Sequence, residues 1–130
     1  MKNLITLMTI GLMWSCGSEK CADNTICTKI FKSVVVQVQN QTGEAVSLDS
    51  SATYKSGEII FSMDEMEENL EYYVVLNDSH KDLIETSGTE VIFKGWRDGE
   101  ALIEETYIMG HDCCHIIKIE GPDTITVTLD

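Results

Sequence analysis

Five consecutive residues, His111-Asp112-Cys113-Cys114-His115, carry the densest chemistry in this chain. They bring together imidazoles, a carboxylate and thiols, ligand types that suit zinc and copper. His80, or the pair Cys21 and Cys27, could complete a coordination shell. Zinc sites usually separate paired ligands by two or more residues so that both face the ion, and Cys-Cys-His does not. A metal site made of His111, Cys113, Cys114 and His115 is therefore the alternative interpretation, and no cofactor is assigned.

The favoured interpretation of the cysteines is a pair of disulfides, because four cysteines follow Cys16 and an exported chain tends to oxidise them. A bridge between the neighbours Cys113 and Cys114 needs a strained ring. The two remaining pairings stay open, and both join Cys21 and Cys27 to the Cys113-Cys114 segment. Each bridge closes a loop of nearly ninety residues, worth roughly 4 kcal/mol. Because successive strand residues point to opposite faces, the two bridges require a turn or bulge, which we expect at residues 110–112.

No recognised catalytic motif accompanies these residues. The sequence lacks Gly-x-Ser-x-Gly, His-Glu-x-x-His, a phosphate-binding glycine loop and Cys-x-x-Cys. With 22 acidic residues, no particular carboxylate pair can be singled out for acid–base catalysis. We therefore expect a protein that is not an enzyme.

The N-terminus indicates export. Lys2 supplies a positive charge, residues 4–14 form an apolar run, and Ser15 precedes Cys16. This order is typical of a secretory signal, and the run is too short to span a bilayer, which needs about 20 apolar residues. The Ser15-Cys16 exit resembles the lipobox of bacterial lipoproteins. The resemblance implies cleavage before Cys16 and acylation of that cysteine, and several acyl chains would hold the protein firmly on a membrane.

The predicted organisation has three parts. Residues 1–15 form the signal peptide, residues 16–30 form a lipid-anchored tether and N-terminal arm, and residues 31–130 form one domain. Gly17 stands where an aspartate often retains such proteins in the inner membrane. The outer membrane, on its periplasmic or surface face, is therefore the expected location.

The charge of the mature part limits its partners. Removing residues 1–15 leaves eight basic residues against 22 acidic ones, a formal charge of −14. Such a surface repels nucleic acids and disfavours docking on anionic lipids through basic patches. Cationic ligands and divalent ions remain compatible with it.

Alternating and continuous apolar runs predict an all-β fold. Val34, Val36 and Val38 share one strand face, and Asp98-Gly99 is a hairpin signal. The expected strands cover residues 34–39, 45–48, 52–54, 58–61, 72–76, 89–96, 100–109, 113–119 and 124–129. Such a series of short strands favours a single antiparallel sandwich of about seven strands.

One short helix is predicted over residues 62–73. Ser62 can cap it, and Met63, Met66, Leu70 and Tyr73 recur at spacings of three and four. Loops 77–82 and 97–99 are the expected contact sites. Trp96 and Tyr107 flank the second loop and could form an aromatic recognition surface, although cross-strand packing is the favoured interpretation.

The run Val34-Val35-Val36-Gln37-Val38 followed by Thr42-Gly43-Glu44-Ala45-Val46 resembles the opening of carboxypeptidase-regulatory-like and transthyretin-like domains. The resemblance implies an immunoglobulin-like or transthyretin-like Greek-key sandwich that serves as a non-catalytic module. The expected function is therefore a lipid-anchored binding module for a protein or another envelope component. The alternative is an envelope protein that binds zinc or copper through residues 111–115.

Overall fold

The computed structural model describes residues 21–64, 66 and 70–129, so the predicted signal peptide and Cys16 lie outside the described residues. These described residues form eight strands and one 3-10 helix. In order they are β1 (Ser33–Gln39), β2 (Ser50–Lys55), β3 (Glu58–Met63), β4 (Tyr72–Asn77), η1 (Asp78–Leu83), β5 (Thr89–Arg97), β6 (Glu100–His111), β7 (Ile116–Glu120) and β8 (Thr124–Thr126).

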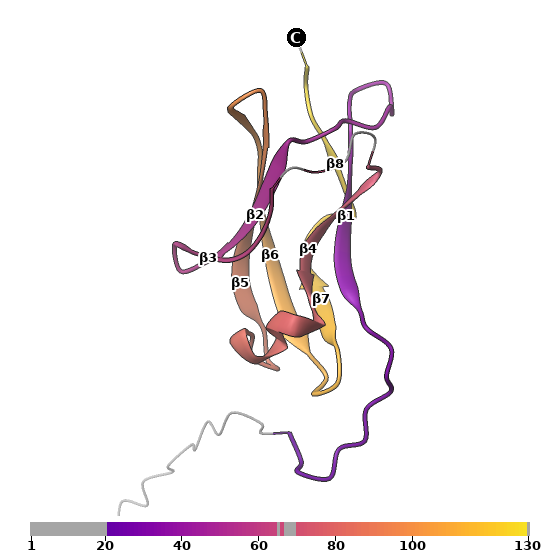
Figure 1. Cartoon of the computed structure of the whole chain (residues 1–130), viewed down its shortest axis with the longest axis vertical. Coiled ribbons are helices and arrows are strands. Elements are labelled where there is room, and N and C mark those ends of the chain that lie inside the picture. The colour runs from indigo at the N-terminus through magenta and orange to yellow at the C-terminus, as the bar shows by residue number, and fades with distance from the viewer. Residues whose placement is uncertain (1–20, 65, 67–69, 130) are drawn as a thin grey trace, which may run out of the picture.

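The strands form two facing sheets, which confirms the predicted all-β sandwich (Figure 1). One sheet has the order β4-β1-β8 and the other has the order β3-β2-β5-β6-β7. All pairs are antiparallel except β1 and β8, which run parallel. The parallel pair arises because β8 returns beside β1 after the turn that follows β7.

The core lies between the two sheets. Val36 and Val38 of β1 face the buried side chains of Val91 and Phe93 of β5, as the alternation along both strands requires. The Thr53 hydroxyl of β2 donates a hydrogen bond to the Val75 carbonyl of β4 and so links the sheets through a polar contact. Burial of apolar side chains on both inner faces is the main stabilising contribution.

Two tight hairpins follow from local sequence. Asp98 and Gly99 adopt φ values of 51° and 78° between β5 and β6, and Ser56 and Gly57 adopt 51° and 82° between β2 and β3. Positive φ at both central residues suits the right-handed twist of the flanking strands. The predicted hairpin at Asp98-Gly99 is confirmed, and Ser56-Gly57 forms the turn between the strands expected at residues 52–54 and 58–61.

The predicted helix over residues 62–73 is wrong. Ser62 and Met63 complete β3, where Ser62 pairs with Ala52, and Tyr73 is a buried residue of β4. Residues 65 and 67–69 lie outside the described residues, and the described residues 64, 66, 70 and 71 are not helical. Strand pairing at both ends of the segment prevailed over the three-and-four spacing. Among the described residues the helical element is η1, where Asn77 accepts a hydrogen bond from the Ser79 N–H as its cap.

Three strand boundaries also differ from the prediction. The strand expected from Cys113 begins at Ile116, and β8 ends at Thr126 although the expected inward-outward alternation continues to Leu129. Residues 45–48 form only an isolated bridge between Ala45 and Gln39. Two hydrogen bonds with the Tyr73 hydroxyl hold this segment instead: the hydroxyl donates to the Val46 carbonyl and accepts from the Leu48 N–H.

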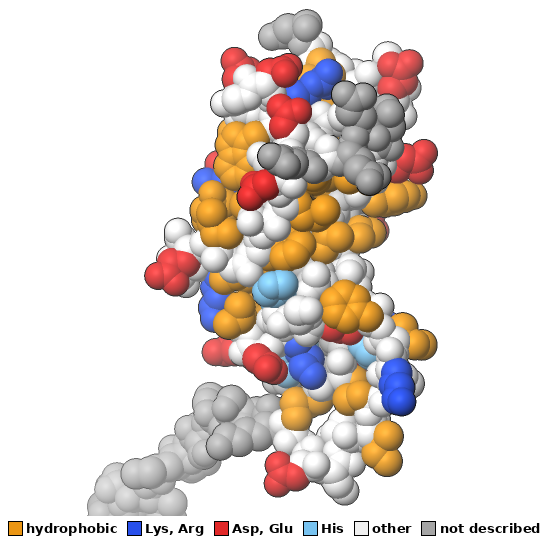
Figure 2. All heavy atoms as spheres, in the orientation of Figure 1, with side chains coloured by type: hydrophobic (Ala, Val, Ile, Leu, Met, Phe, Trp, Pro, Cys, Tyr) orange, Lys and Arg blue, Asp and Glu red, His pale blue; other side chains and the backbone are white. Residues whose placement is uncertain are grey.

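The molecule has two unlike ends (Figure 1). The arm pole carries residues 21–32, η1 and the turn between β6 and β7. The distal pole carries the connection from β1 to β2, the β5–β6 turn and the C-terminal residues 127–129. Figure 2 shows hydrophobic side chains over the middle of one face and acidic side chains around them.

Candidate functional site

Two disulfides fix the N-terminal arm to the sandwich. Cys21 is bonded to Cys113 and Cys27 to Cys114, with Cα–Cα distances of 5.5 Å and 5.2 Å. The predicted joining of the arm to this cysteine pair is confirmed. The sequence had left two connectivities open, and the structure selects this one.

The turn that presents both cysteines is formed by residues 112–115. Gly110 and His111, which were expected to form the turn, remain in β6. Asp112 Oδ1 accepts hydrogen bonds from the N–H groups of His115 and Cys114, and these bonds lower the pKa of Asp112 below its ordinary value. Cys113 adopts a φ of 74°, a left-handed conformation that breaks the strand alternation. Adjacent cysteines can therefore both bond to one arm.

A second connection holds the arm through His115. The ring nitrogen Nε2 of His115 lies 3.0 Å from the Thr28 hydroxyl of the arm, and Nδ1 lies 2.8 Å from Asp78 Oδ2. Asp78 Oδ2 also accepts the backbone N–H of Lys32, and Oδ1 accepts that of Ile116. His115 is only 7% exposed, so this predicted metal ligand is instead a buried link between the arm, η1 and β7.

The Asp78 carboxylate is ionised under ordinary conditions. Burial would raise its pKa, but the hydrogen bonds from the His115 ring and from the N–H groups of Ile116 and Lys32 outweigh that effect and lower the pKa to about 2. A carboxylate acceptor fixes the His115 tautomer with its proton on Nδ1. Nε2 is then free to accept the hydroxyl proton of Thr28.

This series of hydroxyl, imidazole and carboxylate has the order of a nucleophile–base–acid relay. A relay for acyl transfer also requires donors for the developing oxyanion. The N–H groups of Cys114 and His115 are occupied by Asp112, and the N–H of Cys113 donates to His111 Nδ1. The arrangement acts as a clasp that fastens the arm, and we call it the Thr28–His115–Asp78 clasp.

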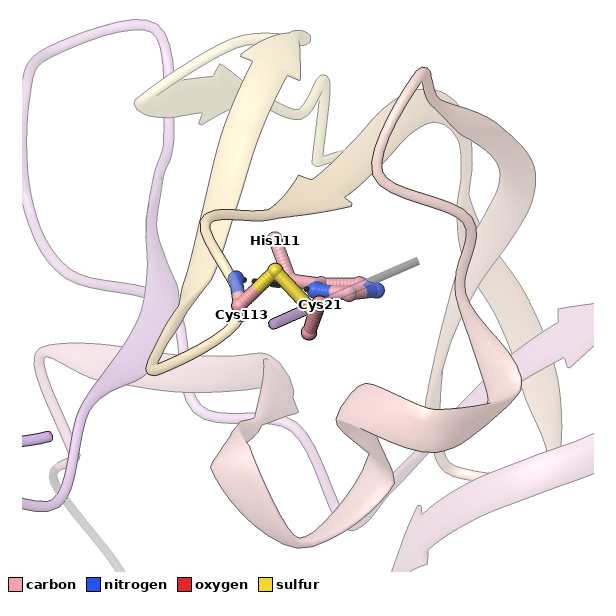
Figure 3. Close-up of side chains that lie close together, drawn as sticks. All are labelled: Cys21, His111 and Cys113. Atoms are coloured by element: carbon pink, nitrogen blue, oxygen red, sulfur yellow. Dashed lines mark hydrogen bonds between the residues drawn. A yellow bond between two sulfur atoms is a disulfide. The ribbon is translucent and has the colours of Figure 1, made fainter. Parts of the chain in front are cut away.

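One group of potential metal ligands lies beside the first disulfide. Ligand atoms of Cys21, His111 and Cys113 are all within 4.8 Å of one another, as Figure 3 shows for the three side chains. Both sulfurs belong to a disulfide, and only thiolates are effective ligands. The predicted set is therefore divided: His111 and Cys113 lie together, Cys114 is bonded to Cys27, and His115 faces Thr28 and Asp78. His80, the other suggested ligand, contacts Asn77 and the Phe61 ring.

The distal pole contains a hollow that the sequence did not predict. It is an open depression of about 450 Å³ on the outer side of the five-stranded sheet, next to the β5–β6 turn. Its lining comprises Asp49, Ser50, Ser51, Ala52, Tyr54, Ile59, Ser62, Asp64, Trp96 and Gly99. We call it the Trp96 hollow. A concave site with aromatic walls and a few polar groups is the usual form of a ligand site.

The predicted aromatic surface of Trp96 and Tyr107 does not exist. Tyr107 is fully buried in the core, and its hydroxyl donates to the Pro122 carbonyl. Burial raises the pKa of Tyr107 strongly. Trp96 points outward and shares the hollow with Tyr54 instead. A regular two-residue hairpin would place Trp96 and Tyr107 on the same face, but the register shift between Gly95 and Trp96 turns Tyr107 inward, opposite the buried Val91. The partner Tyr54 follows only from the pairing of β2 with β5.

The two expected contact loops lie at opposite poles. Residues 78–82 belong to η1 at the arm pole, and residues 97–99 border the distal pole, where Gly99 lines the Trp96 hollow.

No protein-family model, curated protein or solved structure matches the chain. Within the part of the chain that the structure describes, no helix is long and apolar enough to cross a bilayer.

Proposed function

We propose that this protein is a lipid-anchored envelope lipoprotein that acts as a non-catalytic binding module. The acyl anchor is Cys16, and the ligand site is the Trp96 hollow. The expected location is the outer membrane, which follows from the signal and from Gly17.

The observation that supports this proposal is that the fold has two different ends, the arm pole and the distal pole. Cys16 precedes the disulfide-bonded Cys21 by five residues, which span at most about 17 Å when extended. The arm pole must then stay near the lipid. The β5–β6 turn lies at the other end of the sandwich (Figure 1). The Trp96 hollow borders this turn on the outer side of the five-stranded sheet, and so it would be held away from the anchor.

The arm itself is suited to lie close to lipid. Ile26 is 95% exposed, and Ile30 and Phe31 are exposed by 64% and 60%. Apolar side chains of this kind add binding at a bilayer interface when they sit next to an acyl anchor. The disulfides and the Thr28–His115–Asp78 clasp would hold these residues at one end of the molecule.

Acylation is tested by expressing the full chain and a Cys16→Ser variant in a bacterial host. The wild-type protein should fractionate with the outer membrane, and its intact mass should show loss of residues 1–15 and addition of acyl chains. Cys16→Ser should lack those chains and leave the membrane fraction. Recovery of the unprocessed wild-type chain from the cytoplasm would overturn the proposal.

The binding role is tested with photo-crosslinking residues introduced one at a time on the intact cell envelope. A probe at Gly99, which lines the hollow, should give specific adducts, whereas a probe at Asp23 on the arm pole should give lipid adducts only. Specific adducts from the arm pole alone would contradict the assignment of the ligand site. Turnover of hydrolase substrates by the purified protein would contradict the non-catalytic role.

Metal binding is a second candidate, favoured by the closeness of Cys21, His111 and Cys113. It requires reduction of the Cys21–Cys113 disulfide by a thiol reductant, because the freed thiolates would be the ligands. Cobalt added to the reduced protein should then give thiolate charge-transfer bands that disappear in His111→Ala. Lack of these bands would dismiss this role.

A further inference from the structure

We propose that the Trp96 hollow binds the alkyl cation of a lysine or arginine side chain from a basic peptide segment. This inference rests on the proposed function and names the ligand class of the same site. It is drawn from the composition of the lining, the geometry of the floor and the charge around it.

The lining selects for positive charge. Two carboxylates, Asp49 and Asp64, border the hollow, and its described lining contains no Lys, Arg or His. Neither carboxylate forms an ion pair with a described residue. Asp49 Oδ2 accepts the backbone N–H of Asp98, which fixes this carboxylate beside the β5–β6 turn. An incoming cation would therefore meet two carboxylates whose negative charge no described residue neutralises. One of them, Asp49, is held in a fixed orientation by its hydrogen bond.

The strand register shapes the hollow as a trough. Ser50 pairs with Trp96 and Tyr54 pairs with Ile92, so the two aromatic residues lie at opposite ends of a four-residue span on the outer face. That span is about 13 Å along the strands. Ala52 lies between them, is 4% exposed and has the smallest side chain of the row. The short side chain of Ala52 keeps this part of the row low next to the Trp96 ring, where the alkyl chain of a ligand would lie.

The aromatic walls suit an ammonium or guanidinium group. The ring face carries negative charge density, which attracts cations. The protein already uses Tyr54 in this manner, because Lys94 Nζ lies 4.9 Å from the ring centroid. Lys94 pairs with Ala52 between the two aromatic residues, so Tyr54 already holds a cation of the protein itself. The Trp96 ring, whose backbone carbonyl accepts the Asp49 N–H, is the aromatic face that remains for a ligand. The formal charge of −13 for the full chain adds long-range attraction for a basic partner.

Two other ligand classes match the lining less well. Calcium takes six to eight oxygen ligands. The lining offers two carboxylates and three serines, but rings and aliphatic side chains make up much of the rest. A neutral oligosaccharide could stack on the rings and bond to the serine hydroxyls, but it would leave the charge of both carboxylates without a counter-charge. The aliphatic part of a lysine or arginine side chain fits the apolar floor, and its charged end fits the carboxylates.

Trp96 provides a direct probe of this site. The chain contains two tryptophans, and Trp14 lies in the predicted signal, so Trp96 would be the sole tryptophan of the mature protein. Acylated mature protein in neutral detergent is titrated with acetyl-Gly-Lys-Gly-Lys-Gly-amide, and Trp96 fluorescence is recorded. We expect a saturable change that weakens with added salt. The same peptide with norleucine in place of lysine should bind at least roughly ten-fold more weakly.

Matched carboxylate variants locate the effect. Asp49→Asn and Asp64→Asn should each weaken binding roughly five-fold, as expected for loss of one partly screened charge. Asp23→Asn removes the same charge at the arm pole, so it is the control for net charge and should leave the affinity unchanged. Circular dichroism of each variant verifies that the fold is retained.

Three results would overturn the cation proposal: no saturable response, equal binding of the norleucine peptide, or equal weakening by Asp23→Asn. A saturable response to a neutral oligosaccharide but not to the lysine peptide would also overturn it, while leaving the binding role intact. Failure of acylation at Cys16 would instead sink the proposed lipoprotein function. The titration would then use the uncleaved chain carrying Trp14→Phe, in which Trp96 is the sole tryptophan.

Discussion

The two disulfides should contribute to stability in a strongly non-additive way. In the unfolded chain, whichever bridge forms first closes a loop with a sequence separation of 92 or 87 residues. A loop of this size is worth about 4.6 kcal/mol in the chain-entropy model. The second bridge then closes only a small ring through residues 21–27 and 113–114, which is worth about 2.5 kcal/mol.

Removing either bridge should therefore cost only the smaller amount. We expect Cys21→Ser/Cys113→Ser and Cys27→Ser/Cys114→Ser each to lower the free energy of unfolding by about 2.5 kcal/mol. The variant without all four cysteines should lose about 7 kcal/mol, more than the sum of the two. Since domains of this size have about 5–15 kcal/mol in total, that variant should be near the limit of folding.

Guanidinium unfolding at pH 7, followed by circular dichroism, measures these differences. Wild-type protein unfolded with excess dithiothreitol serves as the control and should match the four-cysteine variant. Equal costs of 4–5 kcal/mol for each single bridge, or no further loss on removing the second, would refute the ring argument.

Three further predictions concern single residues. Asp78 has a pKa of about 2 in the folded protein against an ordinary 3.8, so its stabilisation is complete above about pH 4 and is lost as the pH falls toward 2. Asp78→Asn should remove a pH-dependent contribution on the order of 2 kcal/mol from acid-unfolding curves, and parallel curves for both proteins would contradict this. Gly121→Ala would drive a Cβ into the Tyr107 ring at a φ of 133°, whereas Gly57→Ala places a Cβ in open space at a φ of 82°, which is closer to the left-handed helical region. Thermal unfolding should show a loss for Gly121→Ala that exceeds that of Gly57→Ala by at least about 2 kcal/mol, and equal losses would dismiss the steric reason. Thr53→Val should lower the free energy of unfolding in urea by about 1–2 kcal/mol, because it leaves the Val75 carbonyl without its donor. Thr53→Ser keeps a hydroxyl and should cost less. A larger cost for Thr53→Ser than for Thr53→Val would argue against this hydrogen bond.

Local signals in the sequence predicted much of the fold. The alternation of Val34, Val36 and Val38 identified β1, and Asp98-Gly99 identified the turn between the two longest strands. The joining of the arm to the Cys113–Cys114 pair also followed from counting cysteines. Each of these signals needs only neighbouring residues or a simple count. The failed helix over residues 62–73 shows the limit, because its spacing fitted a helix while pairing with β2 made Ser62 part of a strand.

The candidate site depended on long-range geometry. The left-handed conformation of Cys113 lets both neighbouring cysteines bond to the arm, and the path of the arm past them sets which cysteine pairs with which, a choice that no local pattern encodes. The contact of His115 with Asp78 joins residues 37 positions apart. The Trp96 hollow needed the register of β2 against β5 to bring Tyr54 to the same face.

The sequence by itself determined the strand-rich class, the hairpin turns and the cysteines available to cross-link the arm, because hydrophobic periodicity, glycine at positive φ and cysteine number act locally. The tertiary structure alone decided the disulfide connectivity, the clasp around His115 and the placement of a hollow away from the arm. These features arise where separate strands and turns meet, and a one-dimensional pattern does not contain the register that brings them together.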